Sequence, residues 1–419
     1  MSKIYSISEI SILNKSSLST KDNYEYINYL DTSNLTKNKI DSIQFIKSEF
    51  PSRAKRKVEN NTILYSTVRP NQEHHGIVEN NEIENFIVST GFTTVDVVSE
   101  YISPKYLYYK LTQPAITEYL QNIAENSVSA YPSIKPEAIG NLNFRFPDLS
   151  TQQKIAAVLS ALDDKIELNN KINAELEAMA KTLYDYWFVQ FDFPNAEGKP
   201  YKSSGGKMEY NETLKREIPK GWEVKSVGHL TALLTRGISP IYIDGNAGIP
   251  VLNQKCVRDN RVMYQFQRRH DYTTKGISNK IIEKYDVLVN STGVGTLGRV
   301  AMVRWLNENI VTVDSHVTIL RCFSDVINKI FYGYSIITKQ PEIENFANGS
   351  TGQVELNRSQ LADINLLIPS QNLQNDFAAL YSSIIEKTSI NEVQNIELAQ
   401  LRDWLLPMLM NGQVKVESN

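Results

Sequence analysis

The sequence contains one motif that could bind a nucleotide cofactor, the glycine-rich stretch Gly293-Val-Gly295-Thr-Leu-Gly298. A GxGxxG loop binds a dinucleotide when it follows a strand and opens a helix whose N-terminus faces the pyrophosphate. Residues 286–291, DVLVNS, predict the strand, but RVAMV directly after the loop favours a second strand. We therefore expect a tight turn that presents Arg299. An enzyme that binds a nucleotide or S-adenosylmethionine through Gly293–Gly298 remains an alternative.

Residue types that ligate metals or perform acid–base chemistry are few and scattered. None of the five histidines has HExxH spacing or a cysteine pair nearby; they are His74, His75, His229, His270 and His316. The two cysteines, Cys256 and Cys322, lie too far apart for a paired metal-binding spacing. We expect no metal site and no catalytic residue. We also expect a solvated loop at His74 and His75, and a solvent-facing helical position for Asp163-Asp164-Lys165.

Lysine and arginine gather in two segments, together with polar and aromatic residues. Residues 53–57 precede a predicted strand that Arg69 follows, and residues 253–280 interleave basic residues with Tyr264, Phe266 and Tyr272. Lys and Arg neutralise phosphates, Arg reaches guanine edges, and Asn or Gln can read adenine. Asn253, Gln254 and Gln267 are candidates for that last role. The candidate DNA contacts are Arg53, Lys55, Arg56, Lys57, Arg69, Lys255, Arg258, Arg261, Arg268, Arg269, Lys275, Lys280 and Arg299. A solvated surface edge is the alternative interpretation.

The overall composition limits these possibilities. The 419 residues hold 44 Lys and Arg against 47 Asp and Glu, so a uniformly basic nucleic-acid coat is excluded. Residues 215–370 carry an excess of Lys and Arg, and residues 371–419 an excess of Asp and Glu. With 41% hydrophobic residues and no long apolar run, we expect a soluble, cytoplasmic protein of two to four domains.

The chain contains an internal repeat, and this repeat determines how the polar residues are positioned. Residues 129–147 resemble residues 351–369: Ile134, Ile139 and Leu142 recur as Leu356, Leu361 and Ile364, always 222 positions later. Upstream, TILYSTVRP (62–70) resembles DVLVNSTGV (286–294), and STGFTTVDVV (89–98) resembles VDSHVTILRC (313–322). Small changes of offset are typical of loop insertions. We expect two mixed domains, each followed by a helix, with a linker in residues 195–224.

Each half ends in a stretch with the 4-3 apolar spacing of a coiled coil. The first runs through Ile155, Leu159, Leu162, Ile166, Asn169, Asn173, Leu176, Ala180, Leu183 and Trp187. The second runs through Phe377, Tyr381, Ile384, Thr388, Asn391, Asn395, Leu398, Arg402, Leu405 and Leu409. Arg402 on this seam and Pro407 near its end distinguish the second stretch.

Asparagine occupies the same two seam positions in both stretches, Asn169 and Asn173 in one and Asn391 and Asn395 in the other. A buried Asn fixes helix register, since other alignments leave its amide without a partner. We expect the two helices to pair antiparallel, with these residues setting the register. Two helices that each pack only on their own domain are the alternative. Antiparallel pairing would place the mixed domains at opposite ends of a rod, a geometry suited to two half-sites on one duplex.

These residues resemble the specificity subunits of type I restriction–modification enzymes. The resemblance covers essentially the whole chain and rests on STQQKIAAVLSALDDKIELNNKINAELEAMAKTLYDYWFVQFDFP (150–194), GKPYKSSGGKM (198–208) and EIPKGW (217–222). DVLVNSTGVGTLGRVAMV and STGQVELNRSQL also resemble the family's second target recognition domain.

The resemblance implies an α+β protein with a pseudo-two-fold internal repeat, in which two target recognition domains flank two long antiparallel coiled-coil helices. The implied parts are recognition domain 1 (1–149), spacer helix 1 (150–193), a linker (194–221), recognition domain 2 (222–370) and spacer helix 2 (371–412).

The resemblance also implies a non-catalytic subunit that binds a bipartite sequence of double-stranded DNA. Two methylation subunits and the restriction subunits would assemble on it, and S-adenosylmethionine, ATP and Mg²⁺ would act in those partners. A coiled-coil adaptor that binds only proteins is a further alternative.

Overall fold

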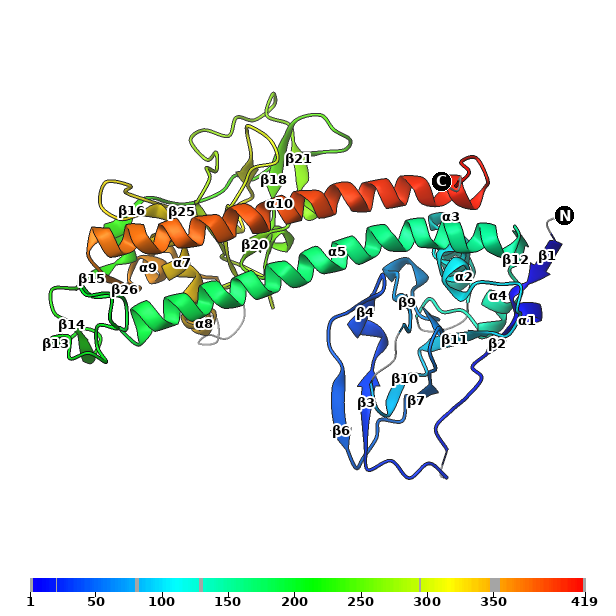
Figure 1. Cartoon of the computed structure of the whole chain (residues 1–419). Helices are drawn as coiled ribbons and strands as arrows, with labels where there is room; N and C mark the ends of the chain where they lie inside the picture. Colours follow the sequence, from blue (N-terminus) through cyan, green and yellow to red (C-terminus); the bar gives the residue numbers. More distant parts are fainter. Residues whose placement is uncertain are drawn as a thin grey trace. The chain divides into compact units, whose positions relative to one another are not determined.

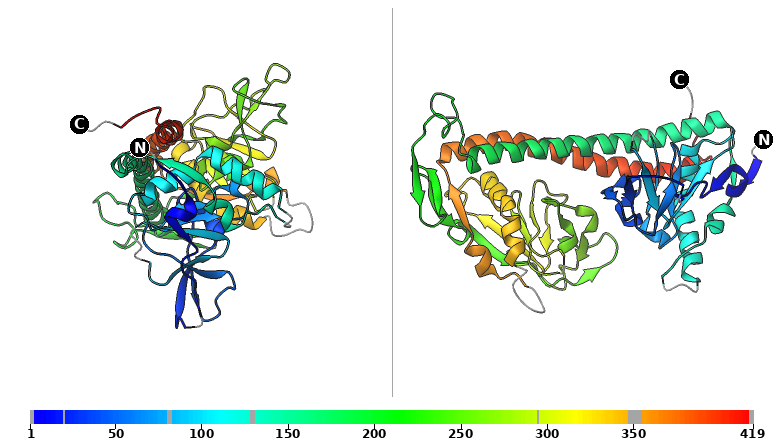
Figure 2. Two further views of the ribbon diagram at one scale, coloured as in Figure 1. Left: turned by 90° about the vertical axis from the view of Figure 1, so that its right-hand side faces the viewer. Right: turned by 90° about the horizontal axis from the view of Figure 1, so that it is seen from below.

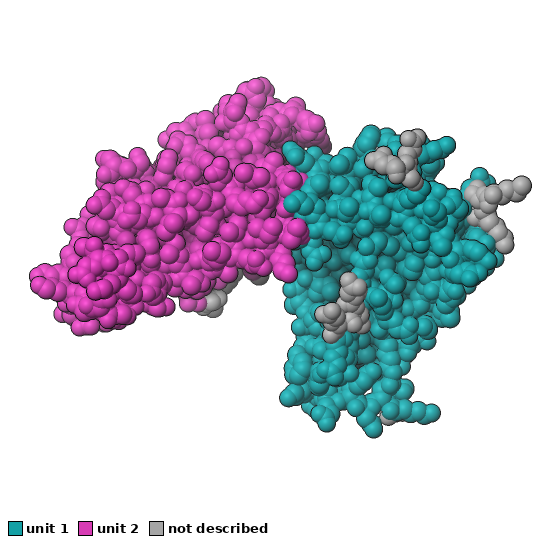
Figure 3. Space-filling view, in the orientation of Figure 1, with its two compact units in different colours: residues 1–167, 395–419 teal, residues 168–394 magenta. Residues whose placement is uncertain are grey.

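The computed structural model describes residues 3–19, 21–79, 83–127, 131–293, 295–346 and 355–416. The chain forms two compact units: unit 1 is residues 1–167 with 395–419, and unit 2 is residues 168–394 (Figure 3). Two long helices, α5 (Leu149–Tyr184) and α10 (Gln371–Met410), each contribute one segment to each unit. The mixed α/β composition and the two-domain organisation agree with the sequence analysis.

Unit 1 contains two four-stranded sheets, with strand orders β6-β3-β10-β7 and β2-β11-β8-β9, and the antiparallel pair β1–β12 (Figure 1). Its strands are β1 (Lys3–Ser6), β2 (Ser11–Leu13), β3 (Tyr26–Leu30), β4 (Leu35–Thr36), β5 (Lys39–Ile40), β6 (Gln44–Lys47), β7 (Ala54–Lys57), β8 (Ile63–Ser66), β9 (His75–Ile77), β10 (Phe86–Ser89), β11 (Phe92–Val97) and β12 (Asn143–Phe146). Its short helices are α1 (Ile7–Ile10), η1 (Thr32–Asn34), η2 (Pro70–Gln72), α2 (Pro104–Leu111), α3 (Pro114–Glu125) and α4 (Pro136–Gly140).

Unit 2 contains sheets of order β17-β21-β18-β24 and β16-β25-β22-β23, and the pairs β13–β14 and β15–β26. Its strands are β13 (Met208–Asn211), β14 (Arg216–Pro219), β15 (Glu223–Ser226), β16 (Thr231–Arg236), β17 (Tyr242–Ile243), β18 (Ile249–Leu252), β19 (Val257–Arg258), β20 (Arg261–Val262), β21 (Arg268–His270), β22 (Val287–Asn290), β23 (Val300–Met302), β24 (Thr312–Val313), β25 (Val317–Cys322) and β26 (Asn365–Ile368). Its helices include α6 (Val227–Leu230), η4 (Gln254–Cys256), η5 (Tyr264–Phe266), α7 (Lys329–Thr338), α8 (Gln340–Asn345) and α9 (Arg358–Ala362).

The two units repeat one topology. The antiparallel order β2-β11-β8-β9 corresponds to β16-β25-β22-β23. The parallel pair β3–β10 corresponds to β18–β24, and in each unit a short 3₁₀ helix leads into a small hairpin, β4–β5 or β19–β20. The repeat read from the sequence is therefore also a repeat of strand order and pairing.

Side-chain hydrogen bonds repeat as well, at the start of each long helix. Buried Gln152 donates from Nε2 to the Pro147 carbonyl over 2.8 Å, and buried Gln374 donates to the Pro369 carbonyl over 2.9 Å. The Oε1 atom of each glutamine accepts the backbone N–H at the N-cap of a helix, Ser103 for α2 and Asn328 for α7. A buried glutamine thus joins sheet, helix and long helix in both units.

Both units pack their sheets against the long helices. In unit 2 the aromatic residues Tyr184, Phe331 and Phe377 meet in one core, with Tyr184 and Phe377 ring centroids 5.6 Å apart. In unit 1 Leu159 of α5 and Leu409 of α10 belong to the core that contains α2 and α3. Burial of these large apolar surfaces is the main stabilising contribution, about 25 cal/mol for each Å² removed from water.

The seam residues of α5 and α10 are all buried or half-buried. In unit 2, Asn391 donates from Nδ2 to Oδ1 of Asn173 over 2.7 Å, and Asn169 donates to Oε1 of Gln394 over 2.9 Å. In unit 1, Arg402 Nη1 lies 2.7 Å from Asp163 Oδ1. In each unit, earlier residues of α5 therefore meet later residues of α10, so the helical segments run antiparallel (Figure 2).

One local expectation differs from the structure, and two further segments gain detail. The segment expected to be a linker contains the hairpin β13–β14, with Met208 opposite Pro219. Lys55, Arg56 and Lys57 lie within strand β7, and the strand expected after them is β8, which Arg69 follows. Pro407 lies inside α10, which continues to Met410. No helix within the described ranges is long and apolar enough to cross a membrane.

Candidate nucleic-acid interface

The glycine-rich loop joins two antiparallel strands, β22 and β23, as the sequence predicted. Its glycines have positive φ angles of 103° at Gly293, 75° at Gly295 and 84° at Gly298, which favour residues without a Cβ. A Cβ on Gly293 would lie 2.7 Å from Oε1 of Gln254, and one on Gly298 would lie 2.8 Å from the Glu344 Cα. Val294 is outside the described residues. Gly293 and Gly298 therefore allow close packing, and a strand follows the loop where a dinucleotide site requires a helix.

Arg299 lies half-buried at the base of this loop. Its Nη2 donates to the Gly295 carbonyl over 2.9 Å. The guanidinium therefore stabilises the loop.

The candidate basic residues of unit 1 divide into exposed and internally bonded groups. Arg53 and Lys55 are exposed. Arg56 is half-buried and donates to Ser17 Oγ over 3.0 Å, and Lys57 forms an ion pair with Asp22. Burial lowers the pKa of Arg56.

Arg69 is exposed and lies on the loop after β8. Its backbone has a positive φ of 47°, and its guanidinium lies 5.3 Å from the ring centroid of Tyr131, which is also exposed. An exposed arginine and an exposed aromatic ring from neighbouring loops can contact phosphate and base together.

The basic residues of unit 2 divide in the same way. Lys255, Arg258 and Arg268 are exposed, and Arg268 lies over the Tyr242 ring, 3.5 Å from its centroid. Arg261 approaches Glu392 of α10 at 3.5 Å, and its position between sheet and helix makes it a structural contact.

Three further cations of unit 2 bond to residues on other segments of the same unit. Arg269 pairs with Glu308 and donates to the Asn246 carbonyl over 2.8 Å. Lys275 donates to the Ser239 carbonyl over 2.9 Å, and Lys280 to the Gly237 carbonyl over 2.8 Å. Of the interleaved aromatic residues, Tyr264 is buried and donates its hydroxyl to the Trp305 carbonyl, while Phe266 and Tyr272 remain exposed.

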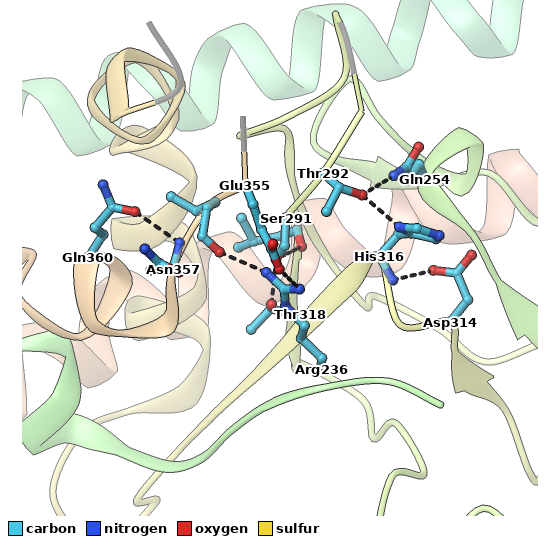
Figure 4. A network of polar contacts seen from close by, with 12 residues as sticks. Arg236, Gln254, Ser291, Thr292, Asp314, His316, Thr318, Glu355, Asn357 and Gln360 are labelled. Atoms are coloured by element: carbon cyan, nitrogen blue, oxygen red, sulfur yellow. Dashed lines mark hydrogen bonds and ion pairs between the residues drawn. The ribbon is translucent and has the colours of Figure 1, made fainter. Parts of the chain in front are cut away.

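A polar network that the sequence analysis identified only in part connects three loops of unit 2 (Figure 4). Gln254 of η4 donates from Nε2 to Thr292 Oγ1 over 2.6 Å. Thr292 Oγ1 lies 2.7 Å from Nδ1 of His316, whose backbone N–H donates to Asp314 over 2.9 Å. Gln254 was a candidate from sequence, but Thr292 and His316 were not. Thr292 follows β22 and His316 precedes β25, so the pairing of these two strands brings the two residues together.

Beside this network, Arg236 bonds Glu355 and the Leu356 carbonyl, and Ser291 bonds Thr318 (Figure 4). Asp314 is buried, and desolvation raises its carboxyl pKa. The loops are thus held by neutral and charged hydrogen bonds that leave His316 exposed.

Two expectations from the sequence are wrong. His75 is not in a solvated loop but is 5% exposed on β9, where burial lowers its pKa to about 3. Asp163 does not face solvent freely: it accepts the Tyr109 hydroxyl over 2.6 Å and pairs with Arg402. Its carboxylate therefore offsets the arginine on the second seam.

The thiols are buried, and burial raises the pKa of Cys256 to about 12 and of Cys322 to about 11. Both remain protonated and poorly nucleophilic at neutral pH. Among the described residues, no three side chains of metal-binding type lie together. The groups gathered on the exposed loops are hydrogen-bond donors, acceptors and cations, which are the groups that read nucleic acid.

Known proteins resemble the chain along most of its length. The specificity subunit of the type I restriction enzyme HindI from Haemophilus influenzae is 27% identical, over 93% of this chain and 95% of the relative. The MjaIX specificity subunit from Methanocaldococcus jannaschii is 28% identical over 78% of this chain and 72% of the relative. The S subunit of a type I restriction–modification system from M. genitalium shares the fold, with a TM-score of 0.54 at 15% identity, covering 100% of this chain and 97% of that one.

The family model described as "Type I restriction modification DNA specificity domain" matches two regions, residues 1–178 and 219–400. The matched regions contain the two repeats of the topology and most of both long helices. The chain therefore belongs to the type I restriction–modification DNA specificity family.

Proposed function

We propose that this chain is the DNA sequence-recognition subunit of a type I restriction–modification complex, a subunit without catalytic activity of its own. Residues 1–149 and 222–370 act as the two recognition domains, each reading one half of a bipartite duplex sequence. Residues 150–193 and 371–412 act as spacer helices, and residues 194–221 connect the two halves. A subunit of this kind acts where the cell's DNA lies, in the cytoplasm.

The observation that carries this proposal is the repeat of one topology with different loop residues. The two units share strand order and buried glutamine bonds, yet their exposed loops differ: Arg53 and Arg69 occur in one, and Lys255, Arg258 and His316 in the other. A repeated frame with unlike loops suits a protein that reads two unlike half-sites.

The helices are the proposed spacer. Antiparallel pairing within each unit supports a pseudo-two-fold arrangement in which α5 and α10 set the separation of the two half-sites. Asn169, Asn173, Asn391 and Asn395 would fix the register, since the Asn173–Asn391 pair lies fully inside the seam.

The partners supply the chemistry in this proposal. Two methylation subunits and the restriction subunits assemble on the chain, bringing S-adenosylmethionine, ATP and Mg²⁺. The names of the relatives, which are specificity subunits of restriction enzymes, support this assignment.

Duplex binding at several salt concentrations tests the proposal. The chain, assembled with its methylation subunits, should bind its target duplex with log K falling linearly with log salt, by about 0.9 per neutralised phosphate. Weak binding that is insensitive to salt would instead indicate a coiled-coil adaptor. Calorimetry with the isolated chain should give no heat with S-adenosylmethionine, because Gly293–Gly298 leads into a strand; tight binding would support the enzyme alternative.

A further inference from the structure

The two units share a set of backbone hydrogen bonds around one group of loops. In unit 1 the Thr67 N–H donates to the Gly91 carbonyl over 2.8 Å, and the Ile134 N–H donates to the Thr67 carbonyl over 2.8 Å. In unit 2 the Ser291 N–H donates to the His316 carbonyl over 2.8 Å, and the Leu356 N–H donates to the Ser291 carbonyl over 2.9 Å. The backbone at the end of β8 is therefore held as it is at the end of β22.

The side chains on this common frame differ completely between the units. In unit 2 they are Gln254, Thr292 and His316, which form one hydrogen-bonded chain (Figure 4). In unit 1 the positions corresponding to Gln254 and His316 are Thr32, which begins η1, and Gly91 in the turn before β11. The residues that support the fold are therefore repeated in the two units, whereas the residues on the loops are not.

The hydrogen bonds among Gln254, Thr292 and His316 fit the His316 tautomer in which Nε2 carries the hydrogen. With its amide nitrogen on Thr292 Oγ1, Gln254 leaves the threonine hydroxyl to donate to His316 Nδ1, 2.7 Å away. Nε2 then carries the hydrogen. Because the His316 side chain is exposed, Nε2–H is available as an oriented donor toward an external acceptor.

Unit 1 presents a different donor at the equivalent place. A Cβ on Gly91 would lie 2.5 Å from Nη2 of Arg53 and 2.8 Å from Cγ2 of Thr32, so the guanidinium occupies the space that a side chain at 91 would fill. The Arg53 carbonyl accepts the Thr90 N–H over 2.8 Å, which fixes the turn before β7 that carries Arg53. Arg53 itself is exposed.

We infer that these loops are the base-reading sites of the two recognition domains, and that His316 and Arg53 determine which base each domain accepts. This inference rests on the proposed function and deepens it. His316 donates one hydrogen bond to an acceptor on a major-groove edge, such as N7 or O6 of guanine or O4 of thymine. Arg53 has the two-pronged donor geometry that pairs with O6 and N7 of guanine.

Exposed cations beside each site fit the neighbouring phosphates. Lys255 directly follows Gln254, and Arg69 lies on the loop that Thr67 begins. Phosphate contacts position a protein on DNA without specifying sequence. The inference therefore divides the candidate residues into readers, which determine sequence, and anchors, which determine affinity.

Sequencing of methylated sites in cells that express the chain with its methylation subunits tests the inference. H316A should relax one position in one half-site, with a loss of discrimination of roughly 10- to 100-fold. R53A should relax a position in the other half-site. H229A is the matched control, since His229 is also exposed and also bonds a hydroxyl through Nδ1, Ser226 Oγ at 2.7 Å, but lies on α6.

A variant that removes only the hydrogen bond orienting the His316 ring distinguishes a loss of base recognition from a loss of folding. T292V keeps the side-chain shape and removes the hydroxyl bonded to His316, so it should relax the same position as H316A, by a smaller factor. An unchanged methylation motif in H316A and T292V would overturn the inference, as would relaxation of the same half-site by H316A and R53A. If the unmodified chain directs no bipartite motif at all, the proposed function itself fails.

Discussion

At the residue scale, buried polar side chains tie the sheets to the long helices. Arg304 is 3% exposed and is bonded to Glu177 of α5 and, over 3.1 Å, to the Tyr381 hydroxyl of α10. Trp305 donates from Nε1 to Glu392 over 3.0 Å. Buried ion pairs contribute little net stability but become costly when one partner is removed. These contacts therefore fix how the unit 2 sheets are seated on the helices.

His75 should make unit 1 sensitive to acid. Its pKa in the folded chain is about 3, well below the ordinary 6.5, because the imidazole is buried beside Tyr65 and Tyr108. As the pH falls below 6.5, the unfolded chain binds a proton that the folded chain does not, so stability falls with pH. At pH 5 the loss is about 2 kcal/mol.

Denaturant unfolding of the wild type and of H75F checks this prediction. Between pH 7 and pH 5 the wild type should lose about 2 kcal/mol more than H75F, which keeps a stacking ring but has no titrating group. An equal loss in both proteins would contradict the burial assigned to His75.

Sequence reasoning could name some residues of the site and not others. Gln254, Lys255 and Arg53 carry the right functional groups within polar or basic segments, so their types predict a role. His316 and Thr292 each stand alone in sequence, and only the pairing of β22 with β25 brings them together. Comparing the two repeats and noting the positions at which they differ could have indicated His316 and Thr292.

At the element scale, the helices were predictable because a 4-3 apolar period needs only the sequence to be recognised. The same period predicted the seam that contains the Asn173–Asn391 contact. The hairpin β13–β14 was not predicted, since residues 195–224 have few apolar residues and no clear alternation. The partner of Arg402 was missed because Asp163 is bonded from α2 and α10 together, a tertiary contact.

Replacing only one asparagine of the Asn173–Asn391 pair should lower the stability of the fold. N391L removes the donor to Asn173 Oδ1 inside a seam where both residues are at most 1% exposed. An unsatisfied buried acceptor costs about 1–3 kcal/mol. The double variant N173L/N391L should recover most of that loss, since both polar groups are then gone.

A double-mutant cycle from thermal unfolding measures the coupling between the two positions. Q400L, at an exposed position of the same helix, is the matched control and should change stability little. Additive losses for N173L and N391L would show that the two amides do not interact.

At the scale of the whole molecule, one topology is used twice in a chain whose net charge is only −3. In the proposed function, exposed loop cations such as Lys255 and Arg258 meet the phosphates, so binding needs no uniformly basic surface. The repeat also means that each unit has its own sheet frame, whose loops can differ from those of the other unit.

Lengthening both helices should lengthen the unread gap between the half-sites. One heptad inserted in α5 between Asp163 and Asn173, and one in α10 between Asn391 and Arg402, preserves both observed pairings. Seven residues add about 10 Å, or about three base pairs. Selection of bound duplexes should return the same half-sites with a longer gap, and an unchanged gap would contradict the spacer role. Insertion in α5 alone should instead disrupt assembly.

The most direct test of the account is methylation-site sequencing of DNA from cells that express the unmodified chain with its methylation subunits. Two domains that each read one half-site predict a single motif of two short, unlike sequences separated by a gap of fixed length and variable composition. A continuous motif, or a methylation pattern that persists when this chain is absent, would contradict the account.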